Sequence, residues 1–285
     1  MDEELTAAER GPSRTARAVA ALRAVHQLFD GDPKLLDDPI VGRILGPLTI
    51  ERLHARLTDF MAPAVLALRS HVVLRSRYAE DRLLHAVRRG VTQYVILGAG
   101  FDTFAYRQPE WAAPLRIFEV DQPASQNEKR LALSSAAVTM PTNLQLVPCD
   151  FERESFRDAL RTGGFDDSLP AFVSWLGVMV YLHESAADDV FRHVVSLPVA
   201  SEIVFTFAPR GENSRGGSRL AGLAGAAGEP WRTYVDPDEL LVKVRGFGFS
   251  QAALLTPDEA KARYFMGRSD ALPPPRHATI ASATV

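Results

Sequence analysis

The sequence has little of several features that would indicate a specialised class of protein. It contains one cysteine, Cys149, which excludes an internal disulfide and a cysteine-rich zinc site and is compatible with a reducing compartment. No segment approaches the roughly 20 apolar residues of a membrane-spanning helix. The N-terminus carries acidic residues where a secretory signal would need basic ones. We therefore expect a cytoplasmic protein without membrane contact.

An excess of charge of one sign is also missing. The chain has 32 Lys and Arg against 35 Asp and Glu, so its formal net charge is −3. Such a balance provides no overall attraction to nucleic acid, which makes a small molecule the expected partner. The seven histidines form no H-E-x-x-H pattern, and G-x-S-x-G and G-x-x-x-x-G-K-[ST] motifs are lacking. We therefore expect no metal site, no hydrolase elbow and no phosphate-cradling loop.

The order of the apolar segments predicts an α/β protein. Helical patterns occupy the first ninety residues or so, and five strand-like runs separated by helical patterns follow. These runs are TQYVILG, PLRIFEVD, LQLVPCD, PAFVSWLG and SEIVFTFAP. The alternation is typical of βαβ units and predicts a doubly wound, mostly parallel sheet. We expect a helical cap over residues 1–90 and a sheet domain over residues 91–285.

The C-terminal part contains one unusual segment. Residues 211–235 are rich in glycine and small side chains, which is typical of either a functional lid or a poorly ordered loop. After it, DPDELLVKVRGFG predicts a capped helix, and FSQAALL and ATIASATV predict closing strands.

The turn after the first predicted strand is a candidate ligand site. Gly98 and Gly100 lie where the backbone must bend tightly and can approach a ligand. A dinucleotide fingerprint would have a third glycine where Thr103 stands. Asp102 adds a negative charge where phosphates would lie. The turn therefore suits a nucleoside without phosphates.

Acidic residues follow the next two predicted strands. Asp121 stands about 20 residues beyond the glycines, where a carboxylate can bind a ribose diol, although Glu119 projects to the same side and could serve instead. Asp150 and Phe151 follow the third strand and could meet an adenine amine and ring face. Alternatively, Asp150 caps the following helix.

These segments together resemble the leucine carboxyl methyltransferase-like family of class I S-adenosylmethionine-dependent methyltransferases, and within it the bacterial O-methyltransferase branch. The resemblance runs from about Ser13 to Phe249. It rests on SRTARAVAALRAVHQLFDGDPKLLDDP, LGAGFDTFAYR, FEVDQP, CDF and FVSWLGVMVYL in this order. It implies a Rossmann-like sheet with an N-terminal helical cap and S-adenosyl-L-methionine as cofactor.

The resemblance also implies roles for individual residues. Arg75 resembles the arginine that binds the methionine carboxylate, with Arg77 as the reserve candidate; a guanidinium suits this role because it binds carboxylates bidentately. The other matching positions are the cofactor turn (Gly98, Gly100 and Asp102), the ribose carboxylate (Asp121) and the adenine contact (Asp150 and Phe151).

One position departs from the family pattern. Leu176 stands where carboxyl-methylating relatives often carry a glutamate, so neither a contact to the cofactor's amino group nor a protein-methylating role transfers directly. We therefore expect a small-molecule acceptor, enclosed by the cap, the lid and the aromatic residues Trp175, Tyr181 and Trp231. A carboxylate acceptor is already ionised at neutral pH. A phenol or alcohol would benefit from a base, for which Tyr181 and His183 are the candidates.

Two other function classes stay open at this point. An NAD(P)-dependent oxidoreductase would share the sheet, the glycine turn and the ribose carboxylate, but Thr103 argues against it. A protein that binds the cofactor without turnover is compatible with Leu176. Nothing in the sequence indicates an oligomeric state.

Overall fold

The computed structural model describes residues 14–285 except 152, 211–220, 223–224, 226–227 and 229. Most of the predicted lid, residues 211–235, therefore lies outside the described residues. The described part contains a seven-stranded sheet in the order β3-β2-β1-β4-β5-β7-β6. The strands are β1 (Gln93–Leu97), β2 (Arg116–Asp121), β3 (Leu144–Pro148), β4 (Ala171–Trp175), β5 (Glu202–Thr206), β6 (Gln251–Leu254) and β7 (Ile280–Thr284).

The sheet is mostly parallel, as the sequence predicts. Strands β1 to β5 pair in parallel, and β7 inserts antiparallel between β5 and β6. The carboxyl ends of the five parallel strands consequently meet at one edge of the sheet, which we call the carboxyl edge.

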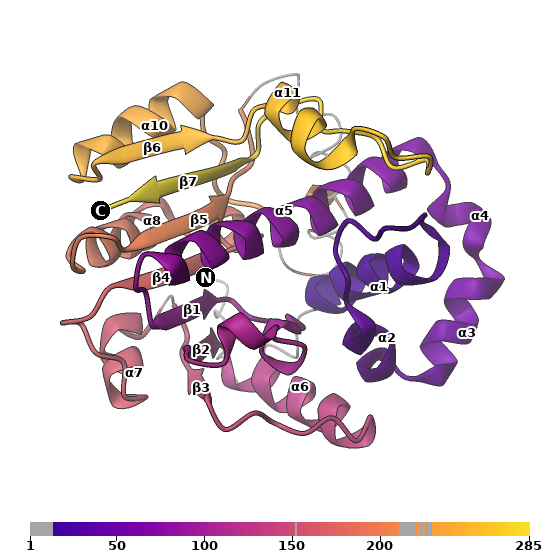
Figure 1. The fold of residues 1–285 in the computed structure, drawn as a ribbon, viewed down its shortest axis with the longest axis horizontal. Coiled ribbons are helices and arrows are strands. Elements are labelled where there is room, and N and C mark those ends of the chain that lie inside the picture. The colour runs from indigo at the N-terminus through magenta and orange to yellow at the C-terminus, as the bar shows by residue number, and fades with distance from the viewer. Residues whose placement is uncertain (1–13, 152, 211–220, 223–224, 226–227, 229) are drawn as a thin grey trace, which may run out of the picture.

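Helices cover both faces of the sheet and its carboxyl edge (Figure 1). Several begin with a proline, whose fixed φ suits a first helical turn. The helices are α1 (Arg14–Phe29), α2 (Pro39–Leu45), α3 (Pro47–Ala55), α4 (Leu57–Phe60), α5 (Pro63–Arg88), α6 (Pro123–Ser135), α7 (Phe156–Thr162), α8 (Glu184–Val195), α10 (Pro237–Gly246) and α11 (Pro257–Ala260). Among the described residues, no helix has both the length and the apolar character needed to cross a bilayer.

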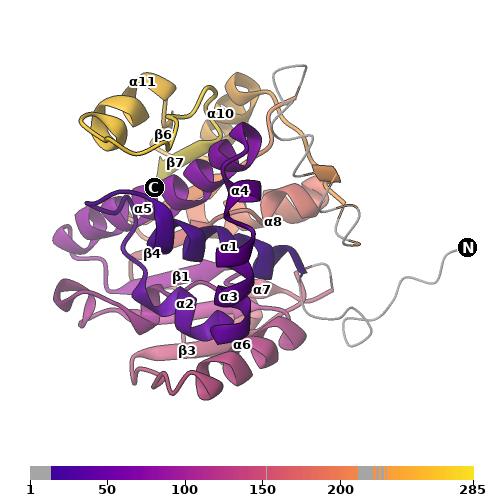
Figure 2. The same ribbon diagram turned by 90° about the vertical axis from the view of Figure 1, so that its right-hand side faces the viewer.

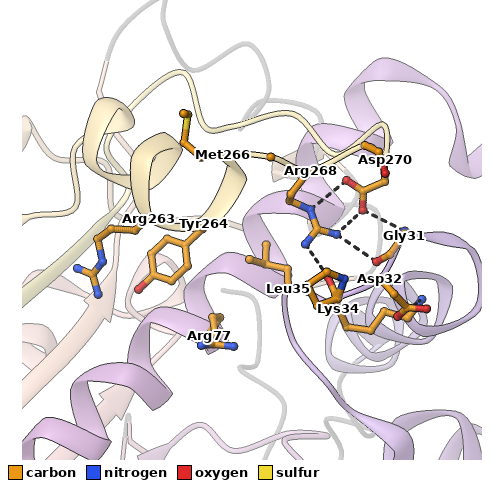
Figure 3. Close-up of a pocket in the computed structure, with 13 residues that line it drawn as sticks. Gly31, Asp32, Lys34, Leu35, Arg77, Arg263, Tyr264, Met266, Arg268 and Asp270 are labelled. Atoms are coloured by element: carbon orange, nitrogen blue, oxygen red, sulfur yellow. Dashed lines mark hydrogen bonds and ion pairs between the residues drawn. The ribbon is translucent and has the colours of Figure 1, made fainter.

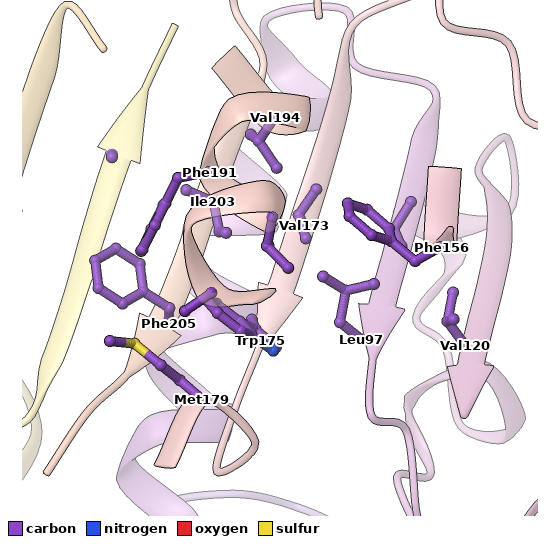
Figure 4. Packing of buried hydrophobic residues seen from close by; sticks show 14 of the residues in the cluster. Leu97, Val120, Phe156, Val173, Trp175, Met179, Phe191, Val194, Ile203 and Phe205 are labelled. Carbon is purple, nitrogen blue, oxygen red and sulfur yellow. The ribbon is translucent and has the colours of Figure 1, made fainter. Parts of the chain in front are cut away.

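The core consists of two layers that share the sheet. Alternate strand residues such as Leu97 and Trp175 pack against α7, α8 and α10 on one face, where the ring of Phe191 of α8 lies 5.6 Å from that of Trp175 (Figure 4). The intervening residues, including Ile96 and Phe172, pack on the other face against α5. Because both faces are covered, the strands are apolar throughout rather than alternating.

A third cluster joins the cap to the sheet. Helices α1 to α4, which we call the cap, lie beside the carboxyl edge, and Figure 2 shows them in front of it. Val25 and Val41 of the cap pack with Phe101, which belongs to the turn after β1, and with Leu133 of α6. The cap therefore packs directly on the segment that the sequence identifies as a ligand site.

Candidate active site

The turn after β1 is held against the end of β2. The main-chain N–H groups of Gly98 and Ala99 both donate to the carbonyl of Val120, over 2.8 and 3.1 Å. Gly98 has a φ of +66°, and a Cβ there would lie 2.2 Å from Cγ2 of Val178. Both the backbone angle and the close approach thus require glycine.

Asp121 lies at the carboxyl edge beside this turn. Its Oδ2 accepts a hydrogen bond from the N–H of Gly100 over 2.5 Å, and its Oδ1 accepts from the N–H of Gln122 over 2.6 Å. Glu119, the alternative, is 1% exposed and paired with Lys129 over 2.7 Å. Burial raises the pKa of Glu119 to about 7, against the opposing effect of Lys129. The interior position of Glu119 favours Asp121 as the ribose ligand.

Asp150 and Phe151 follow β3 at the same edge. Asp150 is buried, Phe151 is half-buried, and the Phe151 ring lies 6.3 Å from that of Phe156. The alternative interpretation of Asp150 as a helix cap is wrong, because α7 begins later and Ser155 caps it by accepting from the N–H of Asp158. The carbonyl of Asp150 instead closes a turn, which leaves the pair at the end of the strand.

Arg75 reaches the carboxyl edge from α5. Its Nη1 would lie 2.6 Å from a Cβ on Gly177, so the guanidinium packs on the bare backbone that follows β4. Burial lowers the pKa of Arg75 to about 10, and the nearby Tyr181 and Asp102 partly oppose this. The side chain thus stays protonated at neutral pH beside the glycine turn.

Arg77, the reserve candidate, lies on a different face of α5. Two residues correspond to roughly 200° around a helix, so Arg75 and Arg77 point in nearly opposite directions. Arg77 is exposed, bonds Asp81 over 2.9 Å and lines a cavity of about 280 Å³ together with the loop after α1 and the segment after α11 (Figure 3). The other cations of that cavity also have carboxylate partners; they are Lys34, Arg263 and Arg268.

The two base candidates occupy different environments. Tyr181 ends the short helix η3 (Met179–Tyr181) after β4, is half-buried and interacts electrostatically with Arg75. His183 is exposed, and its Nε2 lies 2.7 Å from Nη1 of Arg232. The structure therefore places Tyr181 near Arg75, whereas His183 is exposed and contacts Arg232.

The aromatic residues that the sequence predicts around an acceptor also lie in different environments. The N–H groups of Arg232 and Thr233 donate to the carbonyl of Val180 over 2.7 and 3.2 Å, which fixes Trp231 near η3. Within the described residues, the Nε1–H of Trp231 is buried without a hydrogen-bond acceptor. Trp175 is 0% exposed in the core, so the expectation that it encloses an acceptor is wrong.

Sequence reasoning missed His71. It lies one helical turn before Arg75 on the same face of α5, is half-buried, and its Nδ1 is 3.3 Å from Oγ1 of Thr279. Burial lowers the pKa of His71 to about 3, and the charge of Arg75 contributes. The ring is therefore neutral at physiological pH. The spacing of four residues from Arg75 was the only sequence signal for it.

Leu176 packs as an apolar residue. It is half-buried against the cluster on the α5 face of the sheet, and the following Gly177 donates its N–H to Oγ1 of Thr206 over 2.7 Å. The departure from the family pattern thus stands, with no carboxylate at this position.

The residues at the carboxyl edge fit a nucleoside that carries an amino-acid tail. A carboxylate ends β2, an acidic and an aromatic residue follow β3, and a cation lies beside the backbone after β4. At Gly98 the lack of a Cβ lets the turn pack closely against Val178, which holds its backbone at the carboxyl edge. Asp102 near the turn suits a ligand without phosphates.

Comparisons with known proteins agree with this description. A model of the leucine carboxyl methyltransferase family matches residues 16–195. The chain is 35% identical over 208 residues to the Bacillus subtilis protein named "Putative S-adenosyl-L-methionine-dependent methyltransferase YktD", covering 70% of this chain and 67% of that one. A Mycobacterium tuberculosis H37Rv protein named in the same way is 31% identical over 236 residues, covering 79% and 75%.

Solved structures resemble the fold at lower identity. The crystal structure named "putative methyltransferase" from Thermobifida fusca superposes on this chain with a TM-score of 0.59 at 18% identity. The superposition covers 96% of this chain and 95% of that one. A DUF574 family protein from Streptomyces avermitilis superposes with a TM-score of 0.57 at 17% identity, covering 98% and 99%. At these identities the likeness concerns the fold alone.

Proposed function

The chain belongs to the leucine carboxyl methyltransferase family and is an S-adenosylmethionine-dependent methyltransferase, and we propose that it methylates a carboxylate or hydroxyl oxygen of a small molecule. Family membership removes the NAD(P)-dependent oxidoreductase alternative. The observation that carries the proposal is the arrangement beyond β4, where His71, Tyr181 and Trp231 lie next to the proposed cofactor ligands.

We assign each proposed cofactor ligand a role according to its position at the carboxyl edge. Asp121 accepts from the ribose hydroxyls, Arg75 pairs with the methionine carboxylate, and Gly98 and Gly100 keep the turn close to the ligand. Asp150 and Phe151 meet the adenine. When bound, S-adenosylmethionine supplies a methyl group activated by its sulfonium, so the protein must align an acceptor and exclude water.

The acceptor is assigned to the part of the edge beyond β4. The strand order places β5 and β7 on the side opposite β2 and β3. His71, which contacts Thr279 before β7, and Tyr181 and Trp231 lie on that side. Their rings and neutral polar atoms suit a small organic molecule, which must also satisfy the buried N–H of Trp231.

Among the described residues, the candidates for a general base are poorly suited to a phenol, which favours a carboxylate acceptor. His71 has its pKa lowered to about 3 and cannot take a phenol proton efficiently. His183 is exposed and bonded to Arg232. Tyr181 is the remaining candidate, and a carboxylate needs no base because it is ionised at neutral pH.

The test is methyl transfer with a labelled donor. The protein is incubated with methyl-labelled S-adenosylmethionine and matched panels of carboxylic acids and phenols, then with a metabolite extract. We expect labelled esters or ethers. Label on nitrogen, on carbon or only on protein would contradict the proposal.

A second measurement tests the acceptor surface. Trp231→Ala should raise the KM for the acceptor found in this way and leave the affinity for S-adenosylhomocysteine unchanged, because Trp231 is assigned to the acceptor part alone. An unchanged KM and turnover would remove Trp231 from the site.

A further inference from the structure

A buried carboxylate of the cap lies between two arginines. Asp38, just before α2, is 0% exposed. Its Oδ2 lies 3.3 Å from Nε of Arg23, and its Oδ1 lies 3.6 Å from Nε of Arg107. Oδ1 also accepts from the N–H of Val41 over 3.1 Å, which caps α2. A carboxylate so deeply buried requires paired charges, and the two guanidinium groups provide them.

Both arginines also bind the segment that follows the glycine turn. Nη2 of Arg23 donates to the carbonyl of Phe101 over 2.5 Å. Nε of Arg107 donates to Oγ1 of Thr103 over 3.1 Å, and its Nη2 pairs with Glu80 of α5 over 2.5 Å. The two contacts therefore hold the chain on either side of Asp102.

This segment leads directly to the proposed ribose ligand. Phe101 follows Gly100, whose N–H donates to Asp121 over 2.5 Å. On the other side of the turn, a Cβ on Gly100 would lie 3.2 Å from the Cβ of Ala16 in α1, so the cap is in contact with the turn itself. A continuous set of contacts thus runs from Asp38 through Arg23 to the carboxyl edge.

We propose that Asp38 is a positioning residue for the cofactor, which holds residues 98–107 in their binding conformation through Arg23 and Arg107. The cap then contributes to cofactor affinity and is more than a cover for the acceptor. The inference requires that the chain binds its cofactor and is independent of the proposed acceptor.

The variant Asp38→Asn separates this role from helix capping. Asparagine caps a helix about as well as aspartate, so the bond to Val41 can persist while the charge that holds the arginines is lost. We expect the Kd for S-adenosylhomocysteine, measured by calorimetry, to rise about tenfold, as for the loss of one buried ion pair. The matched control is Asp59→Asn, which removes an exposed cap carboxylate paired with Arg56 and should leave the Kd unchanged.

Hydrogen exchange supplies a readout that a merely structural role would not move. Without cofactor, amides of residues 98–107 should exchange faster in Asp38→Asn, while those of β5 and β7 keep their protection. Arg23→Lys serves as the second variant, because one ammonium cannot contact both Asp38 and the Phe101 carbonyl. If Asp38→Asn does not fold, Arg23→Lys must show the same two changes.

Three results overturn the proposal. They are equal Kd values for Asp38→Asn and Asp59→Asn, faster exchange spread over the whole sheet, or a wild-type protein that does not bind S-adenosylhomocysteine. A wild type that binds this ligand but methylates no oxygen acceptor contradicts the proposed function alone.

Discussion

The main-chain N–H of Gly100 donates to the carboxylate of Asp121 over 2.5 Å, which joins the turn after β1 to the end of β2. The two segments thereby form one polar edge, although they are separated in the sequence by two short helical turns, η1 (Phe104–Tyr106) and η2 (Glu110–Ala112). The cofactor proposal depends on this edge.

Asp121→Asn tests the edge directly. The amide can still accept from Gly100 but loses the charge and one acceptor for the ribose hydroxyls, so the Kd for S-adenosylhomocysteine should rise about tenfold or more. Calorimetric titration measures it, and Asp189→Asn on the exposed surface of α8 is the control. Equal affinities of the two variants would remove Asp121 from the site.

Variants of Arg75 and Arg77 together test which arginine binds the amino-acid tail of the cofactor. Arg75→Met should weaken binding of S-adenosylhomocysteine about tenfold or more, because a charge-assisted pair with the carboxylate is lost. The same variant should leave the affinity for 5′-methylthioadenosine unchanged, because this ligand lacks the amino-acid tail. Arg77→Met should leave both affinities unchanged, and the reverse result would exchange the two assignments.

Gly98→Ala should destabilise the protein. The new Cβ would lie 2.2 Å from Cγ2 of Val178, and alanine would have to adopt a φ of +66°. Strain and overpacking together should cost about 2 to 4 kcal/mol in the free energy of unfolding. Denaturant titration measures this loss. Adding Val178→Ala should recover only the part due to the contact, and full recovery would show that the backbone angle is not strained.

His193 should make the protein acid-sensitive. Burial lowers its pKa from 6.5 to about 4, with Asp167 opposing, and its ring lies 5.0 Å from that of Phe156. The unfolded chain protonates His193 more readily than the folded chain does. The neutral ring therefore stabilises the fold fully above pH 6.5, and this stabilisation, up to about 3 kcal/mol in the free energy of unfolding, is lost as the pH falls toward 4. Between pH 7 and pH 5, the free energy of unfolding of His193→Phe should fall less than that of the wild type. An equal loss would mean that His193 does not contribute.

Tyr181→Phe and His183→Ala separate the two base candidates. With the acceptor identified as above, Tyr181→Phe should lower kcat if the acceptor is a hydroxyl and change it little for a carboxylate, because only the hydroxyl needs a base. His183→Ala should remain within about twofold of wild type, since a solvated side chain contributes little. A large loss in His183→Ala would mean that His183 reaches the acceptor when the cofactor is bound.

The local sequence pattern was sufficient to predict the parallel strands of the sheet but not the positions of its last two strands. The apolar runs of β1 to β5 and the helices between them imply parallel pairing, because a crossover helix returns the chain in the same direction. The short strands β6 and β7 were expected as closing strands, yet nothing in their sequence states that β7 lies between β5 and β6. That order is decided by the antiparallel pairing of β7 with both β5 and β6, which are distant from it or from each other in the chain.

The same division holds for the site. The sequence by itself placed a glycine turn after the first strand and acidic residues at the end of the second, because short-range spacing along a strand decides what stands at the carboxyl edge. The class of cofactor came from the family resemblance of these segments. Only the tertiary structure distinguished Arg75 from Arg77 and Asp121 from Glu119, rejected Asp150 as a helix cap, and revealed His71 and the buried Asp38. Those decisions depend on burial and on partners distant in the chain, which periodicity does not record.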